Sequence, residues 1–261
     1  MKKFELTSET KINIFGKKLF RIKALVSFGV VKTGETGGWV EKEENVNQSG
    51  DAWVFDNAEV FGNARVFGNA RVFGNARVFG NAWVFGNAWV FDNARVSGNA
   101  RVFGDAWVFD NAEVSDNAWV SGNARVFGDA EVSDNAEVSD NAEVSDNARV
   151  SGNAEVSDNA EVSDNAWVSG NAEVSDNAWV SGNARVFDNA DYATIHGFGT
   201  QFRTTTFFRC KDKQVKVSCG CFYGTIPEFC EQVKNTRKGK IAEEYLMIAD
   251  LMEKHFAEEA K

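Results

Sequence analysis

A six-residue repeat dominates this sequence and restricts the folds that it can adopt. Valine occupies every sixth position from Val54 to Val186, which gives 23 consecutive hexads of the form Ala-x-Val-[Phe/Ser]-[Gly/Asp]-[Asn/Asp] without an insertion. Alternate residues of an extended strand point to opposite sides, so Ala and Val share one side while the variable residue and Phe or Ser share the other. The last two residues are turn formers that tolerate positive φ. Each hexad therefore predicts a short strand followed by a corner.

Such a unit could build either a meander of hairpins or a coil. A two-residue hairpin would place each Phe or Ser opposite the next Ala, and each Val opposite the next variable residue, which mixes the two sets on both faces. A coil keeps every Ala and Val side chain inside. The repeat therefore favours a coil of parallel strands.

Segments such as VFGNARVFGNARVFGNAWVFGNA and VSDNAEVSDNAEVSDNA resemble the hexapeptide-repeat proteins. The resemblance implies an all-β fold, a left-handed parallel β-helix shaped as a triangular prism with three hexads in each turn. With about 4.8 Å between stacked strands, the coil would have about 7 to 8 turns and be on the order of 35 to 40 Å long. The class includes acyltransferases, metal-dependent hydratases and proteins with no known activity, so this resemblance predicts the fold and leaves the function open.

The hexads divide the chain into residues 1–50, 51–190 and 191–261, and both ends of such a coil need caps because each turn contacts only its neighbours. Residues 1–50 resemble the amino-terminal region of uncharacterised bacterial and phage hexapeptide-repeat proteins with a Gly-Gly-Trp-Val segment. We interpret them as a β cap in which Trp39 covers the open end of the core. Residues 191–261 predict a small ββαα module, which is similar to carboxy-terminal regions attached to such repeats in phage and Firmicutes proteins.

Within this module, strands are predicted at 201–210 and 214–222. Thr225 and Glu228 form a predicted capping box with Pro227 in the first turn of a short helix. A longer helix is predicted at about 240–259, where apolar residues recur at helical spacing.

The outward positions change in character halfway along the coil. The residue after Val is Phe in nine of ten hexads up to Phe109 and Ser in eleven of thirteen from Ser115 onward. Monomers seldom expose large apolar patches, so the Phe-rich half predicts self-association into a homo-oligomer, unless the caps fold back over it. The predicted interface residues are Phe55, Phe61, Phe67, Phe73, Phe79, Phe85, Phe91, Trp53, Trp89 and Trp107.

The tryptophans are expected to form columns, because residues 18 apart lie on the same face. Trp53, Trp89, Trp107 and Trp179 share one face, Trp83 and Trp119 share a second, and Trp167 lies on the third. Two interpretations remain open. The rings could stack on each other and on arginine for stability, or they could form a flat aromatic surface for a partner protein.

Charge changes at the same place as the Phe-to-Ser transition. Residues 51–109 carry five Arg against four Asp and one Glu, whereas residues 110–190 carry three Arg against ten Asp and seven Glu, a net charge of −14. The acidic half could be a solvated face that keeps the protein soluble, a mimic of a nucleic-acid backbone that occupies a DNA-binding protein, or a weak binding surface for divalent cations. The total charge of −10 argues against direct binding to nucleic acid.

The sequence offers no signal peptide and no membrane-spanning segment, so we expect a cytoplasmic protein without membrane contact. The four cysteines, Cys210, Cys219, Cys221 and Cys230, make no disulfide framework for a chain of this size, which agrees with a reducing compartment. Their spacing matches no common zinc pattern, and we expect buried thiols, with a metal site at Cys219 and Cys221 as an alternative.

Candidate catalytic residues are few. Acyltransferases of the hexapeptide-repeat class use a histidine as general base and a loop that leaves the coil, and the hexads contain neither. His196, just after the last hexad, is a weak catalytic candidate, and His255 lies on the predicted long helix. We see no histidine cluster for zinc, no phosphate-binding loop and no nucleophile–base pair, so we expect no metal and no cofactor.

We therefore predict a non-enzymatic structural or protein-binding scaffold that self-associates through its Phe-rich half. Two alternatives remain, an acyltransferase-like enzyme with a site near His196 and an acidic decoy that binds a DNA-binding protein.

Overall fold

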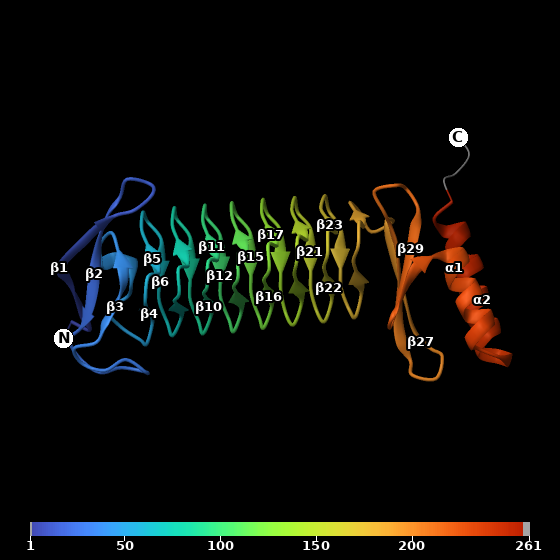
Figure 1. The fold of residues 1–261 in the computed structure, drawn as a ribbon, viewed down its shortest axis with the longest axis horizontal. Coiled ribbons are helices and arrows are strands. Elements are labelled where there is room, and N and C mark those ends of the chain that lie inside the picture. Colours follow the sequence, from blue (N-terminus) through green and yellow to red (C-terminus); the bar gives the residue numbers. More distant parts are fainter. Residues whose placement is uncertain (1, 258–261) are drawn as a thin grey trace.

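The computed structural model describes residues 2–257 and is a rod with the amino-terminal strands at one end and the carboxy-terminal helices at the other (Figure 1). Each hexad forms one two-residue strand, from β4 (Trp53–Val54), through strands that recur every six residues, to β26 (Arg185–Val186). Strands three apart in sequence pair in parallel, which produces three parallel sheets wound around one core. The prediction of a parallel β-solenoid with about 7 to 8 turns is confirmed, and the coil has about eight.

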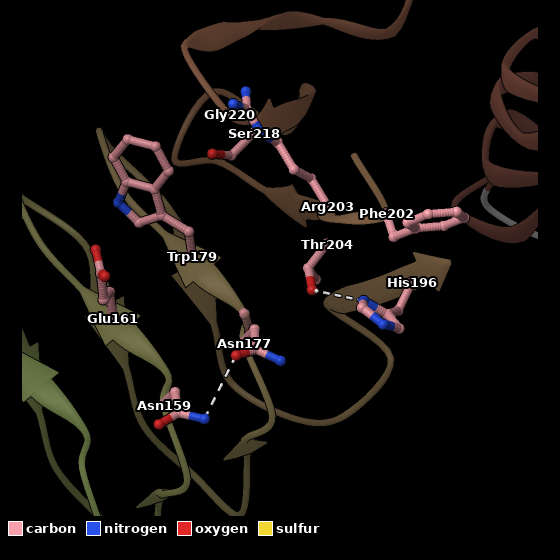
Figure 2. Close-up of a pocket in the computed structure, with 11 residues that line it drawn as sticks. Asn159, Glu161, Asn177, Trp179, His196, Phe202, Arg203, Thr204, Ser218 and Gly220 are labelled. Atoms are coloured by element: carbon pink, nitrogen blue, oxygen red, sulfur yellow. Dashed lines mark hydrogen bonds between the residues drawn. The ribbon is translucent and has the colours of Figure 1, made fainter. Parts of the chain in front are cut away.

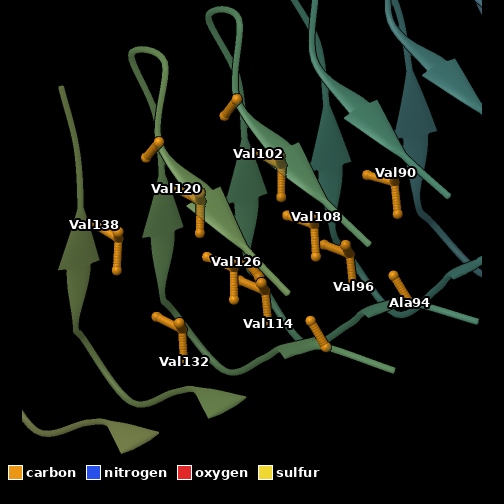
Figure 3. Close-up of a cluster of buried hydrophobic side chains, with 14 of the residues drawn as sticks. Val90, Ala94, Val96, Val102, Val108, Val114, Val120, Val126, Val132 and Val138 are labelled. Carbon is orange, nitrogen blue, oxygen red and sulfur yellow. The ribbon is translucent and has the colours of Figure 1, made fainter. Parts of the chain in front are cut away.

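The interior of the coil is made of the alanine and valine of every hexad, all of which are buried. Valines from the three sheets point toward one another across the interior, as Figure 3 shows for the middle of the coil. The pairing register is 18 residues, so that Val108 of β13 (Trp107–Val108) lies between Val90 and Val126. The strict Ala-x-Val spacing therefore places identical side chains in continuous inner columns.

The corners depend on both residues that follow the Phe or Ser. The fifth residue of the hexad, Gly or Asp, has positive φ from Asp56 to Gly182, for example 64° at Gly98 and 57° at Asp116. Among the residues described, no Asn at the sixth position shares this conformation, so only the first of the two turn formers uses positive φ. The Asn side chains instead form ladders along the corners, in which Asn99 Nδ2 donates to Asn117 Oδ1 at 2.9 Å.

Residues before the first hexad close the amino-terminal end of the core. β1 (Phe4–Ile12), β2 (Lys18–Ala24) and β3 (Thr36–Val40) extend one of the three sheets, with β1–β2 and β2–β3 antiparallel and β3 parallel to β5 (Glu59–Val60). A short 3₁₀ helix follows at Glu43–Asn45. Phe4, Ile22, Ala24 and Val31 join the core cluster of the coil and cover its end.

Trp39 does not cover the core, so this prediction is wrong. Val40 pairs with Val60 and takes the inward position, and the preceding residue of the strand must then point outward. Trp39 packs on the outside against Leu19 and Phe61, and Arg21 lies 4.9 Å from the centre of its ring.

The carboxy-terminal module is a four-stranded antiparallel sheet with two helices on its far side (Figure 1). The structure confirms the two predicted strands as β28 (Arg203–Arg209) and β29 (Val215–Cys219), and adds β27 (Tyr192–Phe198) and β30 (Phe222–Thr225). The helices are α1 (Ile226–Thr236), with the predicted capping box, and α2 (Gly239–His255). The last two residues of the predicted long helix, 258 and 259, lie outside the described residues.

Strand β28 joins the coil to the helices because its alternate residues face opposite ways. Phe208 and Cys210 belong to the core cluster of the coil, whereas Phe207 packs against Phe229 of α1 with ring centroids 6.2 Å apart. The coil, the sheet and the helices thus form successive layers along the rod. No helix within residues 2–257 is long and apolar enough to cross a membrane.

Candidate functional site

Three of the predicted interface residues are covered by the chain itself. Trp53 is fully buried, with Phe4 and Phe28 packed edge-on against its ring at 5.7 and 5.3 Å. Phe61 is only 4% exposed, and Phe79 stacks on it and contacts Phe15. The amino-terminal segment therefore folds back over the first turns, so Trp53 and Phe61 are not available to a partner.

The other phenylalanines of this half shield one another. Phe67, Phe85 and Phe103 form one stacked column, with successive ring centroids 4.8 and 4.9 Å apart. A second column contains Phe73, Phe91, Phe109 and Phe127, with separations of 4.7 to 5.0 Å. Phe55 is half-buried against the core of the first turn. Stacking leaves these rings half-buried, and the surface that they offer is narrower than a fully exposed apolar face.

The tryptophans stack on each other and on arginine, as the first of the two open interpretations expects. Trp89 and Trp107 lie parallel at 5.2 Å, with Arg71 over one ring and Arg125 over the other. On the next face, Arg101 lies between Trp83 and Trp119, 5.2 and 5.1 Å from the two ring centres. Each of these contacts joins neighbouring strands of one sheet and thus stabilises successive turns.

The acidic half carries one column of carboxylates without a cation. Glu137, Glu155 and Glu173 occupy the variable position of three stacked strands, and none of them makes an ion pair among residues 2–257. On the other faces, Arg125 pairs with Glu143 at 3.1 Å and Arg149 with Glu131 at 3.4 Å. Within the described part of the chain, no cluster of His, Cys, Asp or Glu is arranged to hold a metal ion.

A cavity lined by polar and aromatic side chains lies where the coil meets the carboxy-terminal sheet (Figure 2). We call it the junction cleft, and it has a volume of about 450 Å³. Glu161 and Trp179 come from stacked strands of the coil, β22 (Glu161–Val162) and β25 (Trp179–Val180). The remaining polar and aromatic residues that line it are Asn159, Asn177, His196, Phe202, Arg203, Thr204 and Ser218.

Hydrogen bonds fix the position of Trp179. Its backbone N–H donates to Thr206 Oγ1 of β28 at 3.0 Å, and its indole Nε1 donates to Ser163 Oγ at 3.3 Å. The indole is nevertheless 39% exposed. Glu161 lies beside it in the same column, and partial burial, together with the nearby Glu143 carboxylate, raises the pKa of Glu161.

The junction cleft also contains His196, the weak catalytic candidate. His196 is exposed on β27, and its Nδ1 lies 3.4 Å from Thr204 Oγ1. In the described chain no carboxylate hydrogen-bonds to its ring, and the only polar contact recorded for it is this hydroxyl. The Thr204 hydroxyl and the His196 imidazole thus lie together on one wall of the cleft, and the other wall offers an indole, a carboxylate and amides for binding.

The cysteines differ in their environments. Cys210 is buried, and burial raises the pKa of its thiol to about 11. Cys219 and Cys230 are half-buried, and Thr205 Oγ1 donates to Cys219 Sγ at 3.1 Å. Cys221 is exposed, so the expectation of four buried thiols is wrong for this residue, because it lies at the tight turn between β29 and β30.

Sequence reasoning did not find the junction cleft, although part of the signal was present. Trp179 and Glu161 are 18 residues apart, and position 197, one turn further, lies beyond the last hexad. Trp179 was therefore recognisable as the last outward residue of its column. Arg203 and Thr204 come from β28, and their approach to this column depends on how the sheet packs on the coil.

Comparison with protein families supports the repeat architecture. A family model described as the YdcK beta solenoid repeat matches residues 70–86 and 94–110, which cover the Phe-rich half up to its boundary with the acidic half. A search of curated proteins gives no significant match to this sequence. The chain is thus similar to β-solenoid repeat proteins over these segments, and the likeness concerns the fold.

Proposed function

We propose that this protein is a non-enzymatic structural or protein-binding scaffold. The observation that carries the proposal is that most outward side chains contact one another and are not left free for a ligand. Along most of the coil they are engaged with the equivalent residue of the next turn, in Asn ladders, aromatic columns and Arg–Glu or Arg–Trp pairs. A surface organised in this way stiffens the rod and holds its two ends at a fixed separation.

Both ends of the rod support the same proposal. The amino-terminal strands and β28 close the core with apolar side chains, so the coil is a complete unit between two different end modules. The hexads differ little from one another, which suits a spacer better than a unique active site. The carboxy-terminal end, with the junction cleft, is the part of the rod that offers a varied set of polar and aromatic groups.

Self-association through the Phe-rich half is part of the proposal. The acidic half carries a net charge of −14, so two copies would repel one another there, whereas residues 51–109 are neutral. The phenylalanine columns of this neutral half are only half-buried. The residues best placed for contact between copies are Phe67, Phe73, Phe85 and Phe91.

Light scattering coupled to size exclusion tests this proposal. We compare the intact chain with a variant in which Phe67, Phe73, Phe85 and Phe91 are changed to Ser, the residue that occupies the same hexad position in the acidic half. An assembly that falls to 28.8 kDa on substitution supports an interface at the columns. A monomer in both cases contradicts self-association.

Two other results would favour a different function over the scaffold. Turnover of an acyl donor that disappears in His196→Ala would favour the acyltransferase-like enzyme. Displacement of DNA from a basic DNA-binding protein, weakening as salt rises, would favour the acidic decoy.

A further inference from the structure

Trp179 differs from every other tryptophan of the described chain. Trp83, Trp89, Trp107, Trp119 and Trp167 are the other outward tryptophans in the middle and later turns, and each holds an arginine guanidinium 5.1 to 5.7 Å from its ring centre. The two amino-terminal tryptophans, Trp39 and Trp53, also have cation or ring partners. Within residues 2–257, Trp179 has neither an aromatic ring nor a cation against its indole.

The geometry of the repeat explains why Trp179 has no stacking partner. In each Arg–Trp pair on these turns the arginine lies 18 residues from the tryptophan, on the neighbouring strand of the same sheet. One neighbour of Trp179 is Glu161, and the other position would be 197, which the chain uses in β27 and not in the coil. No coil residue therefore stacks on the indole from position 197, and Trp179 lines the junction cleft together with Glu161 (Figure 2).

The charges around this position favour a cation. Glu143 is paired with Arg125, but Glu161 has no ion-pair partner among the described residues. The corner beside the cleft adds Asp158 and Asp176, which precede the cleft residues Asn159 and Asn177. These carboxylates lie in the half of the coil with the strong negative charge, which attracts cations at a distance.

Two groups on the opposite wall work against a cation. Arg203 lines the cleft, although its Nη2 is engaged by Gln201 Oε1 at 2.8 Å, and His196 is exposed nearby. A ligand cation must therefore lie on the Trp179 and Glu161 side. Removal of the Arg203 charge should therefore strengthen the binding of a cation in the cleft.

We infer that the junction cleft binds the guanidinium of an arginine side chain on a partner protein. The guanidinium stacks on the part of the Trp179 indole that borders the cleft, as the chain's own arginines do on the other tryptophans, and donates hydrogen bonds to the Glu161 carboxylate, which lines the same cleft. Guanidinium is preferred to ammonium because it is planar, more weakly hydrated and able to donate two parallel hydrogen bonds to a carboxylate. The inference rests on the proposed scaffold function and names the partner chemistry at one end of the rod.

The test follows the indole N–H of Trp179 in the ¹H–¹⁵N spectrum of the full chain, assigned with Trp179→Phe. The probes are a blocked Gly-Arg-Gly tripeptide, its lysine analogue and its citrulline analogue, which keeps the shape and removes the charge. We expect the arginine peptide to shift the Trp179 signal, the lysine peptide to shift it less and the citrulline peptide to leave it unchanged. Equal shifts with arginine and citrulline, or no shift at Trp179 with arginine, would overturn the inference.

Three variants add a quantitative check. Glu161→Gln should weaken binding of the arginine peptide by about tenfold, which corresponds to about 1.4 kcal/mol. Glu155→Gln is the matched control, because it removes the same charge at the same hexad position on another face, and it should change affinity by less than about twofold. Arg203→Gln should strengthen binding, because it removes the cation on the opposite wall. If Glu155→Gln weakens binding as much as Glu161→Gln, the peptide is held by general charge and the inference fails.

Failure of this inference is distinguishable from failure of the scaffold proposal. Self-association is tested by substitutions in the Phe-rich half, whereas peptide binding is tested by substitutions near the carboxy-terminal end. A chain that assembles through its phenylalanines but gives no Trp179 shift keeps the scaffold and loses the arginine site.

Discussion

Val108→Ala tests whether the coil is held together by close packing of identical interior residues. Val108 is fully buried, lies between Val90 and Val126 in its column, and points toward the valines of the other two sheets (Figure 3). The substitution removes two carbon atoms, worth about 1.6 kcal/mol of transfer free energy, and leaves a cavity that the stacked strands cannot collapse. We expect the free energy of unfolding to fall by about 2 to 3 kcal/mol.

The assay is urea unfolding followed by far-ultraviolet circular dichroism, with the slope of the transition checked for each variant. Val150→Ala is a matched substitution in the acidic half, where the interior is the same and the outward residues differ. The two losses should agree within about 0.5 kcal/mol, because distant sites contribute independently. A loss below about 0.5 kcal/mol for Val108→Ala, or a clear inequality between the two, would refute the argument that interior packing alone sets the stability of each turn.

Three further predictions concern the outward faces. Arg101→Ala removes a cation held between two indoles and should lower the free energy of unfolding by about 1 to 2 kcal/mol in urea titrations, at about 0.5 to 1 kcal/mol for each ring. Deletion of 130–147, three identical hexads that make one turn, should keep an opposite charge beside Arg125 and leave the thermal midpoint nearly unchanged by circular dichroism. Deletion of 130–135 should place a second arginine beside Arg125 and lower that midpoint. The third prediction concerns pH: the pKa of Glu161 is raised on folding, so its contribution to stability is present below the unfolded value and is lost as pH rises through the folded value. Glu161→Gln should therefore raise the thermal midpoint at pH 7 and leave it unchanged near pH 3.5.

Each of these predictions has a control in the chain. Arg65→Ala, on the same face as Arg101, removes an arginine for which no ring contact is found in the described chain, and it should change stability by less than about 0.5 kcal/mol. For the pH prediction, the midpoint of Glu161→Gln is compared with that of the unchanged chain at each pH, and a larger increase near pH 3.5 than at pH 7 would contradict the sign. For the deletions, equal midpoints would show that the 18-residue columns contribute little.

Much of the body of the rod was predictable because its information is local. Val54 to Val186 recur every sixth residue, and the period of a strand places them on the same side as the alanines. The columns of outward residues 18 apart also followed, once three hexads were assigned to a turn. Trp89 and Trp107 were thus expected on one face, and they stack there.

Predictions at the ends of the rod were less successful because they depend on packing between distant segments. Trp39 was predicted to cover the end of the core but packs on the outside of the coil. Trp53 was predicted to lie on an accessible surface but is buried. The sequence around each ring does not indicate which strand or hairpin will cover it. The burial of Trp53 requires Phe4 and Phe28, which reach it only after β1 and β2 fold back over the first turn.

The sequence by itself determined the coil, its corners, its inner columns and the division into a neutral aromatic half and an acidic half. All of these follow from strand geometry and from a strict repeat, so that no long-range information is needed. Only the tertiary structure decided which outward residues remain accessible, and it created the junction cleft by packing β28 against the last turn. The open stacking position at Trp179 arises because a repeat must stop somewhere, and the residues that follow the last hexad determine what lies against its final ring.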